Sequence, residues 1–286
     1  MASPPPPASV PPVSPPPLSS SAPPSALTLA VVETVQQLLA GSPSADQLNK
    51  ALRHVAKWRA ELLSNTLHRR EGTRVISGPF KGMDYCVRAA EGSRTARLLG
   101  AYEASLHPVI EAIIARAPEV IVDIGSAEGY YAVGLALRLP GARVLARDAS
   151  DTAQDRCRAL AAANGVQDRV EVGGFFAHAD FALCAQARSV VICDIEGAEE
   201  ALLDPAAAPG LRHADILVEC HPGAAPGVTD RIMARFADSH RITRIGRKID
   251  DGCLPDWMDE LSDLDRLIAL WEWRSGPTPW LWMERQ

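Results

Sequence analysis

The stretch "VIVDIGSAEGYYAVGLALRLPGARVLARDAS", residues 120–150, indicates the fold of this protein. It reads as a short strand rich in Val and Ile, a glycine-rich turn, a helix-length segment and a second strand. Such units repeat in a doubly wound parallel sheet. The turn differs from the G-x-G-x-x-G turn of dinucleotide-binding domains, because Asp123 precedes its glycines and Glu128 lies between them.

Strands and helices continue to alternate as far as the C-terminus. Short apolar runs predict strands at residues 120–124, 143–147, 169–173, 189–195, 214–220, 241–249 and 279–285. Helix-length segments lie between several of them, at residues 130–139, 152–165 and 178–187. The pattern predicts an α/β fold with a doubly wound, Rossmann-like and mostly parallel seven-stranded sheet.

The front third of the chain has a different pattern. Helical periodicity covers residues 26–41, 44–70 and 93–117, the last interrupted near Gly100 and Pro108. Residues 74–87 read as two short strands around a Gly-Pro turn. We therefore expect a helical cap with a hairpin over residues 26–116, in front of a domain over residues 117–286. Residues 1–25 hold 11 of the 23 prolines, which predicts a disordered tail.

Composition narrows the class of protein. The net charge of -6 gives no general attraction to nucleic acid or to anionic membranes. The six cysteines form no C-x-x-C pair, no apolar run approaches the roughly 18 residues of a membrane helix, and the N-terminus lacks the pattern of a signal peptide. We expect a cytoplasmic enzyme that acts on a small molecule, and the excess of Arg over Lys is typical of a bacterial protein.

The charged glycine turn predicts the ligand. In doubly wound sheets, ligands bind at the carboxyl ends of the strands, here over Asp123, Gly125, Gly129 and Asp148. Carboxylates repel a pyrophosphate but attract an ammonium and a sulfonium, and Asp148 can accept hydrogen bonds from ribose hydroxyls. S-adenosylmethionine combines these groups. In the alternative, Asp123 is only a charge at a helix N-terminus and Asp148 only the N-cap of the following helix.

The row D-x-G-x-x-x-G followed by Tyr130-Tyr131 resembles motif I of class I S-adenosylmethionine-dependent methyltransferases. The form "DIGSAEGYYAVGLA", with "VVICDIEGAEEALLDP" and "ADILVECHP", is similar to the FkbM-type branch of that family. These blocks span residues 119–222. They depart from the pattern at Ala127, where the broader motif has glycine, and at Asp148-Ala149, where the branch has Glu-Pro.

The predicted cofactor residues lie in the turn and after the next two strands. Either Phe175 or Phe176 stacks on the adenine, or both are ordinary core aromatics. The residues that we expect to bind the cofactor are Asp123, Gly125, Ser126, Glu128, Gly129, Tyr130, Asp148 and Phe175.

A second polar group follows the fourth and fifth predicted strands. Asp194 ends one of these strands, and Glu219 and His221 end the other with both side chains on one face. As catalytic residues, the three provide a base with orienting carboxylates for a hydroxyl acceptor. As metal ligands, they suit Mg²⁺ or Mn²⁺. A structural hydrogen-bond network is the third possibility.

Other carboxylates near these strand ends have less certain roles. Glu196 is expected to face the site, whereas Glu199 and Glu200 read as charges in the first turn of a helix. Glu103 and His107, four residues apart, are expected to form a solvated pair rather than to reach over the pocket.

The predicted function is methyl transfer to a hydroxyl of a small molecule or glycan. One alternative is a nucleic-acid methyltransferase, which the negative charge and the "DIEG" turn disfavour, because base N-methylation favours an Asn/Asp-Pro-Pro-aromatic turn. Another alternative is a module that binds S-adenosylmethionine without catalysis.

Overall fold

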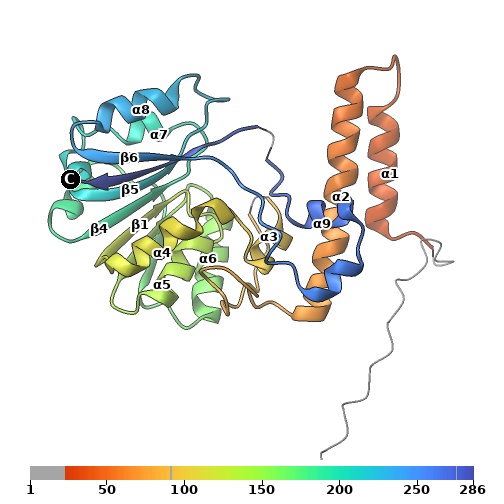
Figure 1. Ribbon diagram of the computed structural model, residues 1–286, viewed down its shortest axis with the longest axis horizontal. Helices are drawn as coiled ribbons and strands as arrows, with labels where there is room; N and C mark the ends of the chain where they lie inside the picture. Colours follow the sequence, from red (N-terminus) through yellow and green to blue (C-terminus); the bar gives the residue numbers. More distant parts are fainter. Residues whose placement is uncertain (1–22, 91, 275) are drawn as a thin grey trace, which may run out of the picture.

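The computed structural model of the protein describes residues 23–90, 92–274 and 276–286 (Figure 1). Residues 1–22 of the predicted tail lie outside the described residues. The division of the remaining chain at residue 116 stays a prediction.

The described residues form a seven-stranded sheet with the order β3-β2-β1-β4-β5-β7-β6. Strands β1 to β5 are parallel, and β7 is antiparallel to both of its neighbours. The predicted mostly parallel α/β sheet is thereby confirmed. The strands are β1 (Val120–Ile124), β2 (Arg143–Arg147), β3 (Val170–Gly173), β4 (Ser189–Cys193), β5 (Ala214–Glu219), β6 (His240–Ile245) and β7 (Trp280–Arg285).

Helices cover both faces of the sheet because successive strand residues point to opposite faces. Ile121 packs in one core with α4 (His107–Arg116), α5 (Tyr130–Arg138) and α6 (Asp151–Ala163). Val122 packs in the other core, beneath α8 (Val228–Phe236). Figure 1 shows α8 on the opposite side of the sheet from α4, α5 and α6. The short helices are α7 (Glu199–Leu202), η2 (His178–Ala185), η3 (Pro209–His213) and η4 (Asp256–Glu260).

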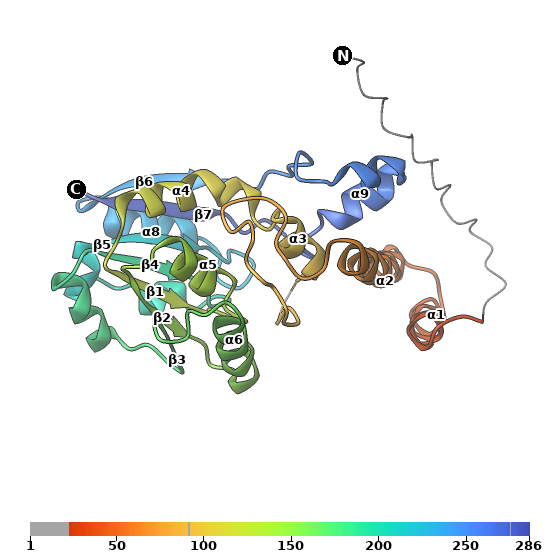
Figure 2. The same ribbon diagram turned by 90° about the horizontal axis from the view of Figure 1, so that it is seen from below.

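The first two helices form a hairpin that extends away from the sheet (Figures 1 and 2). These are α1 (Ala26–Leu38) and α2 (Ala45–Glu71), each with a serine N-cap, Ser25 and Ser44. Helix α9 (Asp263–Ala269), from the C-terminal region, packs beside α2. Arg59 of α2 ion-pairs with Asp265 at 2.6 Å. The two predicted N-terminal helices are therefore confirmed, and a late segment joins them.

Two details of the predicted elements are wrong. Residues 74–87 form no pair of strands, only an isolated bridge between Arg74 and Asp84, because Val75, Met83 and Tyr85 turn into the core instead of lining a two-faced ribbon. Residues 178–185 are a 3₁₀ helix. The predicted interruption of the helix over residues 93–117 is confirmed: the stretch is divided into α3 (Arg94–Leu99), η1 (Ala104–Leu106) and α4, because Gly100 ends α3 in the left-handed conformation.

Contrary to our expectation, one described stretch, residues 94–116, is long and apolar enough by composition to cross a membrane. It is divided between α3, η1 and α4. Its Ile110 and Ile113 lie fully buried in the core beside the sheet. Its apolar character therefore follows from packing inside the protein.

Candidate cofactor and acceptor site

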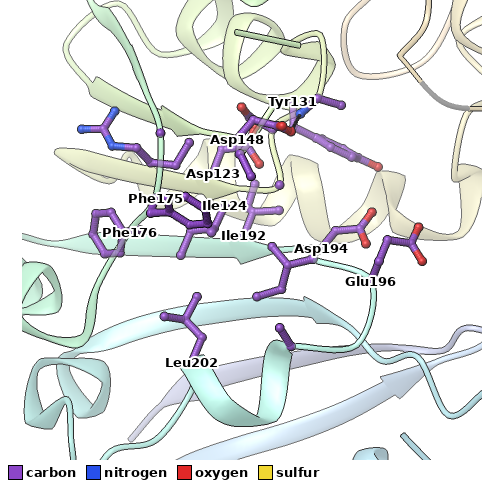
Figure 3. Close-up of a pocket in the computed structure, with 18 of the residues that line it drawn as sticks. Asp123, Ile124, Tyr131, Asp148, Phe175, Phe176, Ile192, Asp194, Glu196 and Leu202 are labelled. Carbon is purple, nitrogen blue, oxygen red and sulfur yellow. Dashed lines mark hydrogen bonds between the residues drawn. The ribbon is translucent and has the colours of Figure 1, made fainter. Parts of the chain in front are cut away.

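A cavity of about 700 Å³ lies over the carboxyl ends of β1, β2 and β4 (Figure 3). The strand order reverses between β1 and β4, which is where doubly wound sheets bind ligands. We call it the cofactor cavity, after the ligand that the sequence predicts. Figure 3 shows Phe175 and Phe176 at one end of it and Asp194 and Glu196 at the other. The predicted cofactor residues that line it are Asp123, Gly125, Ser126, Glu128, Tyr130, Asp148 and Phe175.

The two glycines of the turn have different surroundings, and Gly125 lines the cavity. Gly125 has φ +80°, and a Cβ there would lie 1.6 Å from the carbonyl oxygen of Asp194, so only glycine allows the turn to meet the end of β4. Gly129 has φ +91° and is the N-cap residue of α5. A Cβ on Gly129 would meet the Cys157 Sγ at 2.6 Å. Gly129 therefore packs behind the turn and does not line the cavity.

Four residues that line the cavity carry a buried polar atom without a hydrogen-bond partner among the described residues: Asp123, Ser126, Asp194 and Trp280. Asp123 is 3% exposed, and its Oδ2 has no hydrogen-bond partner. Burial raises the pKa of Asp123 to about 7. The buried hydroxyl of Ser126 likewise has no partner. Buried polar groups are rarely left unpaired, so these groups indicate a ligand with polar atoms.

Two backbone amides hold the carboxylate of Asp148 in place. Its Oδ2 accepts a hydrogen bond from the amide of Ala127 at 2.9 Å, and its Oδ1 accepts one from the amide of Ser150 at 2.8 Å. Each oxygen keeps a further lone pair for a ligand hydroxyl. The alternative in which Asp148 caps the next helix is wrong, because Ser150 is the N-cap of α6 and its side chain accepts from Ala153.

Glu128 is engaged inside the protein. Its fully buried carboxylate lies 2.8 Å from Arg97 Nε and accepts hydrogen bonds from the Tyr85 hydroxyl at 2.6 Å and the Ala90 amide at 2.7 Å. These contacts fasten the segment before α3 to the glycine turn. Arg97 offsets the negative charge of Glu128, so Asp123 is the acid of the turn whose charge has no cationic partner.

The two phenylalanines after β3 have different environments. Phe175 is 89% exposed and lines the cofactor cavity. Phe176 is buried and packs edge-on against Phe181, with 4.8 Å between ring centroids. Both residues line the cavity, but the exposed Phe175 is free to stack on a ligand, whereas Phe176 also packs in the core.

The predicted catalytic side chains lie together. One ligand atom from each of Asp194, Glu219 and His221 falls within 4.8 Å of the others. His221 Nε2 lies 3.6 Å from Asp194 Oδ1 and 3.9 Å from Glu219 Oε2. Glu196 also faces the site, with its Oε2 at 3.4 Å from the same nitrogen.

His221 is oriented by Glu199, which lies in the first turn of α7 as predicted. The Glu199 side chain is fully buried, and its Oε1 lies 2.7 Å from His221 Nδ1. Burial alone lowers the pKa of His221, but the hydrogen bond to Glu199 and the nearby carboxylates raise it overall. With Nδ1 donating to Glu199, the free lone pair of a neutral His221 is on Nε2, which faces Asp194 and Glu196.

Arg274 completes the site and was not predicted. Its guanidinium ion-pairs with Glu103, Glu219 and Glu272. Glu103 was expected to be a solvated partner of His107, but it is 3% exposed and accepts a hydrogen bond from the Tyr131 hydroxyl. The expected helix spacing does not exist there, because Glu103 adopts a left-handed φ of 49° before η1.

The residues Asp194, Glu219 and His221 provide three donors that suit a divalent cation. One carboxylate of the set is already neutralised, since Glu219 is ion-paired with Arg274. Asp194 and the Nε2 of His221 keep free lone pairs. The metal-binding role of the three residues stays an alternative to the base role.

No family model matches the chain. A curated relative, the release factor glutamine methyltransferase of Chlorobaculum tepidum, is 52% identical over 50 residues. That match covers 18% of this chain and 17% of the relative, so the chain spans less than two thirds of the relative's length.

Solved methyltransferase structures are less similar to this chain in sequence. An O-methyltransferase from Bacillus cereus in complex with SAH is 13% identical, with a TM-score of 0.44 over 90% of this chain and 97% of that chain. The O-methyltransferase TomG from Streptomyces achromogenes, in complex with SAM, is 14% identical, with a TM-score of 0.43 over 88% and 96% of the two chains.

Proposed function

We propose that this protein is an S-adenosylmethionine-dependent methyltransferase that methylates a hydroxyl group of a small molecule or glycan. The observation that carries the proposal is the arrangement of polar groups in the cofactor cavity. The Oδ2 of Asp123 and the hydroxyl of Ser126, buried without a hydrogen-bond partner among the described residues, face it on one side. At its acidic end Asp194 lies beside His221. A cationic cofactor and a deprotonated acceptor can thus meet in one space.

The cofactor fits the groups that line the cavity. The carboxylate of Asp123 suits an ammonium, Asp148 suits the two ribose hydroxyls, and the exposed face of Phe175 suits an adenine ring. Asp194 and Glu196 then lie at the end where the sulfonium is expected. Glu128, which Arg97 already neutralises, acts in this scheme by shaping the turn.

The reaction needs a base near the acceptor. When bound, S-adenosylmethionine supplies an electrophilic methyl group on a positively charged sulfur. His221 Nε2 accepts the proton of the acceptor hydroxyl, while Glu199 holds Nδ1 and stabilises the imidazolium that forms. Because the carboxylates raise the pKa of His221, activity is expected to rise with pH until His221 is neutral.

Thermal unfolding tests the cofactor assignment. S-adenosylmethionine and S-adenosylhomocysteine should bind in the micromolar range and raise the melting temperature, because a ligand that binds only the folded state stabilises it by about 2.7 kcal/mol at 100 times its Kd. A larger shift with NAD would contradict the proposal. Binding without any methyl transfer to hydroxyl acceptors would leave the non-catalytic alternative.

A chelator distinguishes the two roles proposed for Asp194, Glu219 and His221. If His221 acts as a base, methyl transfer is unchanged in EDTA. If the three residues hold a metal, EDTA abolishes transfer and Mg²⁺ or Mn²⁺ restores it, and Asp194→Ala is then as damaging as His221→Ala.

A nucleic-acid acceptor is disfavoured by the net charge of -6 and by the acidic end of the cavity, which repels phosphates. A small-molecule acceptor, a cytoplasmic location and a bacterial origin remain part of the proposal.

A further inference from the structure

A second cavity of about 700 Å³, which we call the acidic chamber, adjoins the acidic end of the cofactor cavity. Both cavities are lined by Tyr102, Asp194 and Glu196. The chamber is also lined by Glu219, His221, Glu272, Trp273 and Arg274. A molecule in the chamber therefore contacts the same two carboxylates as a group at the acidic end of the cofactor cavity.

The negative charges of the chamber exceed its fixed positive charges. Its lining holds four carboxylates, those of Asp194, Glu196, Glu219 and Glu272, and the guanidinium of Arg274. The ammonium of Lys57, the other basic residue of the lining, lies 4.8 Å above the ring of Trp273.

Asp194 and Glu196 differ from the other carboxylates of the chamber. Among the described residues, neither ion-pairs with a lysine or arginine, and the Asp194 Oδ1 is buried without a hydrogen-bond partner. His221, which is 6% exposed, directs a nitrogen toward them that makes no hydrogen bond within the described part of the chain. A buried polar nitrogen and a buried carboxylate oxygen thus face the chamber with hydrogen-bonding capacity to spare.

We infer that the acidic chamber binds a hydroxyl acceptor with an ammonium group on a neighbouring carbon, as in amino sugars and amino alcohols, and that Asp194 and Glu196 are the counter-ions of this ammonium. The inference rests on the proposed function.

The spacing of the groups supports this substrate class. The carboxylate oxygens of Asp194 and Glu196 lie 3.6 and 3.4 Å from His221 Nε2, the proposed base. A cation held by either carboxylate therefore lies next to the hydroxyl whose proton His221 accepts. Vicinal amino and hydroxyl groups match that separation. The ammonium also favours loss of the hydroxyl proton, because a neighbouring positive charge stabilises the alkoxide.

The backbone is strained at Glu196. Glu196 has φ 54° and Trp273 has φ 68°, backbone conformations that residues other than glycine rarely adopt. Such strain persists only where the surrounding structure imposes it. Gly197 follows Glu196 and leaves no room for a side chain, since a Cβ there would lie 2.8 Å from the Cβ of Ala224.

Calorimetric titration of the full chain, saturated with S-adenosylhomocysteine in buffer with EDTA, tests the inference with glucosamine and its neutral counterpart glucose. Glucosamine should bind at least tenfold more tightly than glucose. Glu196→Gln should reduce that preference at least fivefold. The matched control is Glu200→Gln, because Glu200 lies nearby in α7 but pairs with Arg231 and lines neither cavity.

Several results would overturn the substrate class. They are equal binding of the two sugars, no binding of either, or an unchanged preference in Glu196→Gln. A response to Mg²⁺ in buffer without EDTA, with no preference for glucosamine, would assign the carboxylates to a metal instead. Failure of the proposed function is distinguished by a separate titration, since the protein would then not bind S-adenosylhomocysteine in the absence of any sugar.

Discussion

The cofactor cavity and the acidic chamber are neighbours of similar volume, but they are built in different ways. Apart from Arg97, Tyr102 and Trp280, the lining of the cofactor cavity comes from residues 123–202, in the turns after β1, β2, β3 and β4. The chamber gathers residues from α2, from the turn after β5 and from the segment before β7. The cofactor cavity therefore follows from successive strand–helix units, whereas the chamber exists only because segments distant in the sequence meet.

The two cavities also balance their charges differently. The cofactor cavity leaves a single buried acid, Asp123, without a cationic partner, and pairs Glu128 with Arg97. The chamber concentrates carboxylates around Arg274 and His221. We expect changes in the cofactor cavity to alter cofactor affinity, and changes in the chamber to alter turnover.

His221→Ala should have the largest effect and should leave the cofactor cavity intact. We expect turnover to fall by about 10²- to 10⁴-fold, because the base is lost, while the Kd for S-adenosylhomocysteine stays within about twofold. Steady-state methyl transfer and calorimetry measure the two quantities. The control is His213→Ala, at an exposed position outside both cavities. If turnover of His221→Ala stayed within tenfold of wild type, His221 would not be the base, and the two cavities would not differ in this way.

Asp148→Ala should have the opposite effect and weaken the binding of the cofactor. Loss of the charge-assisted hydrogen bonds to ribose is expected to cost about 1 to 3 kcal/mol, which is about 5- to 150-fold in Kd. Calorimetry with S-adenosylhomocysteine measures it. Asp151→Ala, in the exposed first turn of α6, is the control and should bind normally. An unchanged Kd in Asp148→Ala would remove Asp148 from the cofactor site.

The pH dependence of cofactor binding should report Asp123. Burial raises its pKa to about 7, so the empty protein holds it protonated below that pH, and only the ionised form attracts an ammonium. The affinity for S-adenosylhomocysteine should therefore rise by about fivefold to tenfold from pH 6 to pH 7.5. Asp123→Asn isolates this effect, because titration of the ligand amine is common to both proteins. Parallel pH profiles for the two would contradict the assignment.

Phe175→Ala and Phe176→Ala form a matched pair with the smallest expected effect on affinity. Phe175→Ala should weaken cofactor binding by about 2- to 12-fold, which corresponds to about 0.5–1.5 kcal/mol of stacking, and leave the melting temperature unchanged. Phe176→Ala should destabilise the fold by about 3 to 5 kcal/mol, because it empties a core position. Thermal unfolding with and without ligand measures both. A destabilised Phe175→Ala would show that its ring packs on the protein.

The sequence by itself determined the sheet, the glycine turn and the strand ends that carry Asp123, Asp194 and Glu219. The period of two along each strand and the crossover between parallel strands are local properties, and parallel strands present their carboxyl ends at one edge of the sheet. Residues at those ends must therefore gather, whatever the details of packing.

Only the tertiary structure decided which charged side chains remain available to bind a ligand. The pairing of Glu128 with Arg97, the burial of Glu103 and the contacts of Arg274 join segments that no sequence spacing relates. Glu199 has the sequence pattern of a surface helix charge, yet it is buried against His221 because α7 packs its first turn beneath that ring. The free energy of a charge depends on its burial and its partners, and both are properties of the assembled fold rather than of the local sequence.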